Sequence, residues 1–144
     1  MRPPNTTPAL APTDARLALL VDGDTATRRL CRETLEGLGF LVAVVETGVA
    51  AVVAAREAEP RIIFIEAQLV DAPARTVVAW LRENPSLAAT PIVLLANRSP
   101  ASLRDPEQPP GTLLTKPVSA RSIRRIIAAL LGGEPMPRRD GAGD

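Results

Sequence analysis

The chain has 144 residues, 46% of them hydrophobic, and a formal net charge of +1. This size and composition predict one folded domain with a substantial core, and the basic residues are spread along the chain without the concentrated patch expected of a nucleic-acid binder. Because the sequence contains no histidine and only one cysteine, histidine-based catalysis, a thiolate zinc site and an internal disulfide are excluded.

The amino-terminal segment, residues 1–14, is rich in proline and predicts a disordered tail. Residues 15–132 are expected to form the domain, and residues 133–144 a second disordered tail. The domain opens with an apolar run at residues 17–21 that predicts a buried strand. Because this run is too short for a signal sequence or a membrane span, we expect a cytoplasmic protein that does not bind membranes.

Strands alternate with helices along the rest of the domain. Apolar runs predict further strands at residues 40–45, 61–66, 91–96 and 112–115. Periodic apolar residues predict helices at residues 25–38, 49–59 and 74–83, and a last helix that Ser119 caps and Gly132 ends. This alternation predicts an α/β fold, a doubly wound five-stranded parallel sheet. The single cysteine, Cys31, and the single tryptophan, Trp80, are expected to be core side chains.

The segment between the last two predicted strands, residues 97–111, departs from this alternation. It contains four prolines where a helix is due, and an interior proline costs about 3 kcal/mol in a helix. We therefore expect the fourth helix to be missing, or shortened to a turn at residues 101–104.

Polar side chains gather at the carboxyl ends of the predicted strands, where open α/β sheets bind their ligands. The residues at this edge are Asp22, Gly23, Asp24, Glu66, Ala96 and Lys116. Glu66 ends the most apolar strand, and a buried charge costs several kcal/mol unless it is paired. Its available partners are Asp22 and Lys116, the only lysine in the chain.

This arrangement resembles the receiver domain of two-component response regulators, a flavodoxin-like fold, over about residues 16–131. The resemblance rests on Leu19-Leu20-Val21-Asp22, Pro60-Arg61-Ile62-Ile63-Phe64-Ile65-Glu66, Pro91-Ile92-Val93-Leu94-Leu95-Ala96 and Thr115-Lys116-Pro117. It implies that an acidic pair beginning at Asp22 holds magnesium and that position 66 accepts a phosphoryl group from a histidine kinase. It also implies that Lys116 binds that group and that the bond before Pro117 is cis.

The chain departs from this pattern at most of these positions. Gly23 replaces the second acidic residue, Glu66 replaces the phosphoaccepting aspartate, Ala96 replaces a threonine or serine, and Leu113 replaces a switching aromatic residue. We therefore interpret the chain as a degenerate, or pseudo, receiver with no catalytic residues and no cofactor. The resemblance then implies a phosphorylation-independent interaction module in bacterial two-component signalling. Its partners would be a histidine kinase, another receiver or an output protein, with a homodimer also possible.

Several interpretations of the pocket that these strand-end residues would form stay open. Glu66 could pair with Lys116 and mimic a phosphorylated acceptor, or the pocket could be a relic, or both residues could simply be solvated. The main alternative is an unorthodox response regulator that accepts a phosphoryl group with Mg²⁺ held by Asp22, Asp24 and Glu66. A small-ligand-binding flavodoxin-like domain is a third possibility, which the absence of a glycine-rich phosphate loop after the first strand disfavours.

Overall fold

We describe the chain from a computed structural model, which defines residues 16–97 and 113–132. The elements in chain order are β1 (Leu17–Val21), α1 (Thr25–Gly37), β2 (Leu41–Val45), α2 (Gly48–Ala58), β3 (Ile62–Glu66), α3 (Ala74–Arg82), the short 3₁₀ helix η2 (Pro85–Leu87), β4 (Ile92–Ala96), β5 (Leu113–Thr115) and α4 (Ala120–Leu130). The predicted α/β alternation is confirmed, and the short helix η2 was not predicted.

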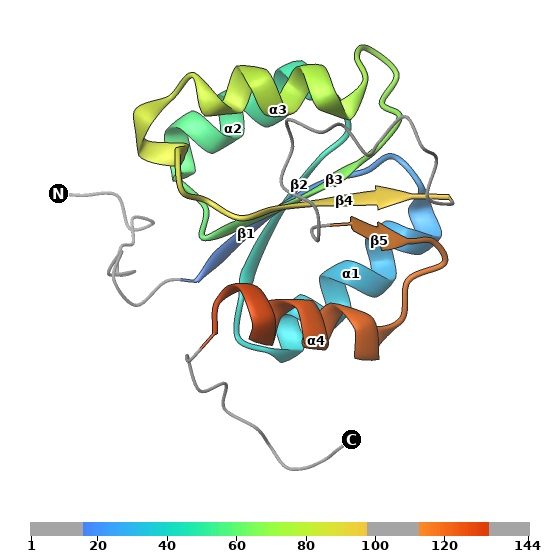
Figure 1. Cartoon of the computed structure of the whole chain (residues 1–144). Helices are drawn as coiled ribbons and strands as arrows, with labels where there is room; N and C mark the ends of the chain where they lie inside the picture. The colour runs from blue at the N-terminus through green and yellow to red at the C-terminus, as the bar shows by residue number, and fades with distance from the viewer. Residues whose placement is uncertain (1–15, 98–112, 133–144) are drawn as a thin grey trace, which may run out of the picture.

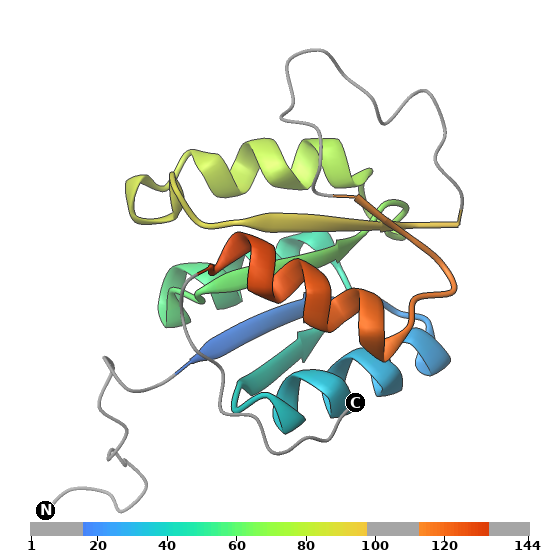
Figure 2. The ribbon, with the colours of Figure 1, turned by 60° about the horizontal axis from the view of Figure 1, so that its bottom comes forward.

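Within the described residues, five strands form one parallel sheet in the order β2-β1-β3-β4-β5. The chain leaves β1 for the edge strand β2, returns past β1 to β3, and then continues outward on the other side. This doubly wound path places α2 and α3 on one face of the sheet and α1 and α4 on the other (Figure 1). Turning the molecule shows α4 running beside α1, against which it packs (Figure 2). The predicted fold class is therefore confirmed.

The two central strands, β1 and β3, feed both layers of the core. In β1, Leu19 and Val21 point to the α2 and α3 side, whereas Leu20 points to the α1 and α4 side, where it meets Phe64 of β3. All four side chains are buried, as a strand covered on both faces requires. This burial explains why both strands read as continuous apolar runs.

The two side chains expected in the core have different outcomes. Cys31 of α1 is fully buried, and burial raises the pKa of its thiol to about 12. Trp80 of α3 is only half-buried: it packs against the α2 and α3 core but also borders the surface. The prediction for Trp80 is thus only partly right, because its indole packs against the core but also lines the groove between α2 and α3.

The helix boundaries follow from local chemistry. Asp24 caps α1 and Thr47 caps α2 through side-chain acceptors, and Ser119 forms a capping box with Ser122 at the start of α4. Gly39, after α1, has a φ of 96°, a left-handed conformation that glycine adopts without a steric penalty.

The expected loss of the helix between β4 and β5 concerns a segment that lies almost entirely outside the described residues, as does the turn expected at residues 101–104. The label α4 therefore belongs to the last helix, which follows β5. None of the helices in the described ranges is long and apolar enough to cross a membrane.

Candidate functional site

The carboxyl ends of four strands bring the predicted site residues together. Asp22 follows β1, Glu66 and Ala96 end β3 and β4, and Lys116 follows β5. The backbone N–H of Lys116 donates to the carbonyl of Ala96 at 2.6 Å, which ties the end of β5 to the end of β4. The Lys116 side chain can therefore reach across the sheet edge toward the acidic residues after β1 and β3.

The Lys116 ammonium lies among three carboxylates. Its Nζ is 3.1 Å from Asp22 Oδ2, 3.6 Å from Glu66 Oε2 and 3.9 Å from Asp24 Oδ2. The lysine side chain is 10% exposed and that of Asp22 is fully buried, so the Asp22 contact is the one best shielded from water. The expected approach of Glu66 to Lys116 is present, but the shortest ion pair of Lys116 is with Asp22.

Asp22 has the most constrained environment of the three carboxylates. Its Oδ1 accepts a hydrogen bond from the backbone N–H of Asp24 at 2.7 Å and lies 3.5 Å from Lys116 Nζ. Its Oδ2 is buried and accepts no hydrogen bond, although Lys116 Nζ is 3.1 Å away. The contact between Lys116 Nζ and Asp22 Oδ2 is therefore an ion pair without a hydrogen bond.

Asp24 serves mainly as a helix cap. Its Oδ2 accepts hydrogen bonds from both the backbone N–H and the hydroxyl of Thr27, in the first turn of α1. The Thr27 hydroxyl is the main reason that the pKa of Asp24 is lowered, with the Thr27 N–H second and Lys116 a smaller contributor. Asp24 Oδ2 is therefore committed to capping α1.

Glu66 lies at the mouth of the pocket with its side chain 24% exposed. Its Oε1 accepts a weak hydrogen bond from the backbone N–H of Gly23 at 3.4 Å. Burial raises the pKa of Glu66, and a hydrogen bond and charge repulsion from Asp22 raise it further, against the opposing effects of Lys116 and Gly23. The two carboxyl groups therefore compete for the single ammonium.

The remaining expected positions offer little chemistry. Ala96 is buried and has no hydroxyl with which to bind a phosphoryl group, and Leu113 in β5 is an aliphatic residue. The peptide bond between Lys116 and Pro117 is cis, as the resemblance implied.

Magnesium, which the resemblance implies, does not fit this donor set. Mg²⁺ requires near-octahedral oxygen ligands. Here Lys116 already neutralises Asp22, Thr27 engages Asp24, and Gly23 has no side chain. Among the described residues, no group of three or more acidic, histidine or cysteine side chains is placed to hold a metal ion.

A further set of hydrogen bonds, which the sequence did not predict, joins the loop after β3 to the start of α2. Asp71, in the loop after β3, accepts hydrogen bonds from the backbone N–H groups of Gly48 at 2.8 Å and Val49 at 3.1 Å. These bonds lower the pKa of Asp71 and tie the loop that follows Glu66 to the start of α2. No local sequence pattern announces a contact that joins residues so far apart.

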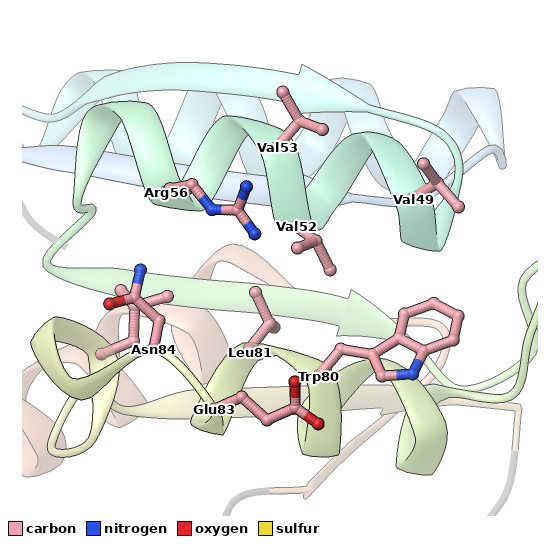
Figure 3. A pocket seen from close by; sticks show the side chains of 9 residues that line it. Val49, Val52, Val53, Arg56, Trp80, Leu81, Glu83 and Asn84 are labelled. Atoms are coloured by element: carbon pink, nitrogen blue, oxygen red, sulfur yellow. The ribbon is translucent and has the colours of Figure 1, made fainter.

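A groove of about 590 Å³ lies between α2 and α3, on the face of the sheet that these helices cover. Figure 3 shows that Val52 and Arg56 of α2 point into it and that Trp80 of α3 stands beside Val52 and Val49. None of the pocket residues at the strand ends lines this groove.

Comparison with known proteins supports the fold. Neither a family model nor a curated protein matches this chain. Among solved structures, the chemotaxis response regulator CheY4 of Vibrio cholerae is similar, with 19% identity over 81% of this chain and 98% of that one and a TM-score of 0.73. The receiver domain of a Pseudomonas aeruginosa sensor histidine kinase, which has magnesium coordinated in its active-site cleft, is 21% identical over 83% and 99% of the two chains, with a TM-score of 0.74.

A third structure extends the similarity over more of the chain. The receiver domain of a signal transduction histidine kinase from Syntrophus aciditrophicus is 21% identical over 90% of this chain and 100% of that one, with a TM-score of 0.73. Each similar domain is matched over nearly its whole length. The chain therefore has the fold of response-regulator receiver domains.

Proposed function

We propose that this chain is a receiver-like interaction module of two-component signalling that works without being phosphorylated. The observation that carries the proposal is the state of the acceptor position. Glu66 stands where the resemblance places the phosphoaccepting aspartate, and its carboxylate is held near Lys116 and the Gly23 N–H. The pocket thus contains both the anion and the cation that phosphoryl uptake would otherwise bring together.

The electrostatics favour a pocket held in one state. Phosphoryl transfer to a carboxylate requires cations that neutralise the incoming oxygens, and here the one ammonium is shared among three carboxylates. An arriving phosphoryl group would have to displace Lys116 from Asp22, leaving a fully buried carboxylate without its countercharge. That cost opposes uptake.

The surface, rather than the pocket, would then carry the function. Ala96 and Leu113 lack the hydroxyl and the aromatic ring that report phosphorylation in the family this chain resembles. We therefore favour a pocket that is a structural relic over one that mimics the phosphorylated state. The partner would be a histidine kinase, another receiver or an output protein.

Intact mass spectrometry after incubation with a small-molecule phosphodonor and Mg²⁺ tests this proposal. We expect no mass increase for the wild type. Glu66→Asp tests the acceptor alone, and Gly23→Asp/Glu66→Asp/Ala96→Thr supplies the missing carboxylate and hydroxyl and serves as the positive control. Wild-type uptake that disappears in Glu66→Gln would overturn the proposal and identify an unorthodox phosphorylatable regulator instead.

The environment of Asp22 is the feature that favours the alternative of a phosphorylatable regulator. Asp22 Oδ2 is buried without a hydrogen bond, so it retains an open acceptor position. If Lys116 turned away, this oxygen would be available to a cation. The same mass measurement in the presence and absence of Mg²⁺ separates the two functions.

A further inference from the structure

Helix α2 exposes apolar side chains along the groove that it forms with α3. Among the large hydrophobic residues that the described part of the chain exposes, Val49 and Val53 of α2 are 59% and 48% exposed. These residues share one side of the helix with Val52 and Arg56, since positions three, four and seven apart lie on one face. We call these four residues the α2 face.

The neighbourhood of the α2 face extends its apolar surface. Val70, in the loop after β3, is 89% exposed and precedes Asp71, which contacts the backbone of Val49. On the other side, Trp80 borders the groove between α2 and α3 (Figure 3). A cluster of exposed apolar residues marks an interaction site more often than isolated apolar residues do.

The α2 face has Asp71 beside its amino-terminal end and Arg56 at its other end. Asp71 is exposed at the amino-terminal end, where its carboxylate accepts from the Val49 N–H. Arg56 is exposed at the other end, where the exposed Glu83 lines the same groove (Figure 3). Arg56 forms no ion pair with any residue of the described part of the chain. Seven positions separate Val49 from Arg56, which is about 10 Å along a helix.

Asp71 and the α2 face are complementary to the same residues of a second copy that runs antiparallel. In a two-fold symmetric contact each residue meets a counterpart in both directions, so an antiparallel pair of α2 helices needs opposite charges at its two ends. An axis between Val52 and Val53 places Arg56 of each copy beside Val49 and Asp71 of the other. The valines then pack at the centre, and two Arg56–Asp71 pairs form at the rim.

We propose that the α2 face is a homodimer interface, in which α2 of a second copy packs antiparallel against α2. The interface uses no residue of the Asp22, Glu66 and Lys116 pocket. It therefore stands whether or not Glu66 accepts a phosphoryl group, and it identifies a partner and a surface that the proposed function leaves open.

Sedimentation velocity of the full chain, from low micromolar to submillimolar concentration, tests the dimer. We expect a concentration-dependent dimer for the wild type and a monomer for Val53→Arg. Like charges facing one another at the centre should raise the dissociation constant roughly a hundredfold. The matched control is Ala129→Arg, which adds the same charge at an exposed position of α4, on the opposite side of the sheet, and should leave the dimer intact.

The rim pairs are tested separately. Arg56→Glu should weaken the dimer several-fold, by an amount that shrinks as salt is added, because exposed ion pairs are screened. Asp71→Asn should act similarly while keeping an oxygen that can accept from the Gly48 N–H. Circular dichroism of each variant confirms that the fold is retained.

Disulfide cross-linking tests which residues face one another in the dimer. Under mild oxidation, Val53→Cys should form an intermolecular disulfide because residue 53 lies next to the proposed axis, whereas Ala129→Cys should not. The native Cys31 is buried, with a thiol pKa of about 12, so it does not compete. A wild type that stays monomeric at every concentration, or a dimer that survives Val53→Arg but not Ala129→Arg, overturns the proposal.

Discussion

Lys116 and Asp22 are 94 positions apart in the sequence, yet the ammonium of one lies 3.1 Å from a buried carboxylate oxygen of the other. The contact joins the end of β5 to the end of β1 across the two strands that separate them in the sheet. Lys116 is therefore a structural countercharge as well as a candidate site residue.

Removing the lysine charge should destabilise the fold. In Lys116→Met, Asp22 remains buried without its cation, and we expect the free energy of unfolding to fall by about 3 kcal/mol. Urea denaturation at neutral pH measures this loss. Adding Asp22→Asn should recover part of the stability, whereas Arg124→Met, at an exposed position of α4, should change little. A Lys116→Met variant with the same free energy of unfolding as wild type would contradict a stabilising ion pair.

Neutralising Glu66 should have the opposite effect. The pKa of Glu66 is raised in the folded state by burial and by Asp22, so the folded protein binds more protons than the unfolded chain between the two pKa values. Wild-type stability therefore falls as the pH rises through the folded pKa. We expect Glu66→Gln to be more stable than wild type at neutral pH and to show a flatter pH profile in thermal melts.

The control for this prediction is Glu57→Gln, at an exposed position of α2. It should leave the free energy of unfolding at neutral pH nearly unchanged. A Glu66→Gln variant less stable than wild type would mean that the attraction of Lys116 outweighs burial and Asp22.

Gly48 is expected to resist substitution for a steric reason. A Cβ at this position would lie 2.6 Å from Val77 Cγ2, so Gly48→Ala should cost about 1–3 kcal/mol despite the better helix propensity of alanine. Adding Val77→Ala should relieve the clash. Gly37→Ala, which meets no atom within 4 Å, should be neutral or stabilising. Chemical denaturation compares the variants.

Arg82 should hold the connection between α3 and β4. Its Nη1 donates to the carbonyls of Leu87 at 2.7 Å, Ala88 at 3.1 Å and Thr90 at 2.9 Å. Arg82→Met should cost about 1 kcal/mol, since these carbonyls lose a charged donor. Hydrogen exchange should become faster in η2 and at the start of β4 but stay unchanged in α1. An increase in exchange rate that is the same throughout the described residues would contradict this local role.

The sequence predicted the fold because each strand and each α-helix of the described residues has a local signal. Apolar runs located the strands, and Asp24, Gly39 and Ser119 marked helix ends where the structure has them. The parallel alternation then placed Asp22, Glu66 and Lys116 at one edge of the sheet. Contacts between distant segments were less predictable: Glu66 was expected to be the partner of Lys116, whereas Asp22 lies closer.

Three features had no local signal. All three depend on how distant segments pack. They are the hydrogen bonds from Gly48 and Val49 to Asp71, those from Arg82 to backbone carbonyls, and the partial exposure of Trp80. The α2 face was also missed, because a valine- and alanine-rich helix in the sequence looks the same whether its outer side is covered or bare.

The space around Gly23 has a consequence for how this pocket relates to an acidic one. A Cβ built at Gly23 meets no atom within 4 Å, so the first carbon of a side chain has space there. The strand ends that frame this edge belong to one parallel sheet of the described residues. Substitutions at Gly23, Glu66 and Ala96 therefore change side chains along an edge whose strands are already joined in one sheet.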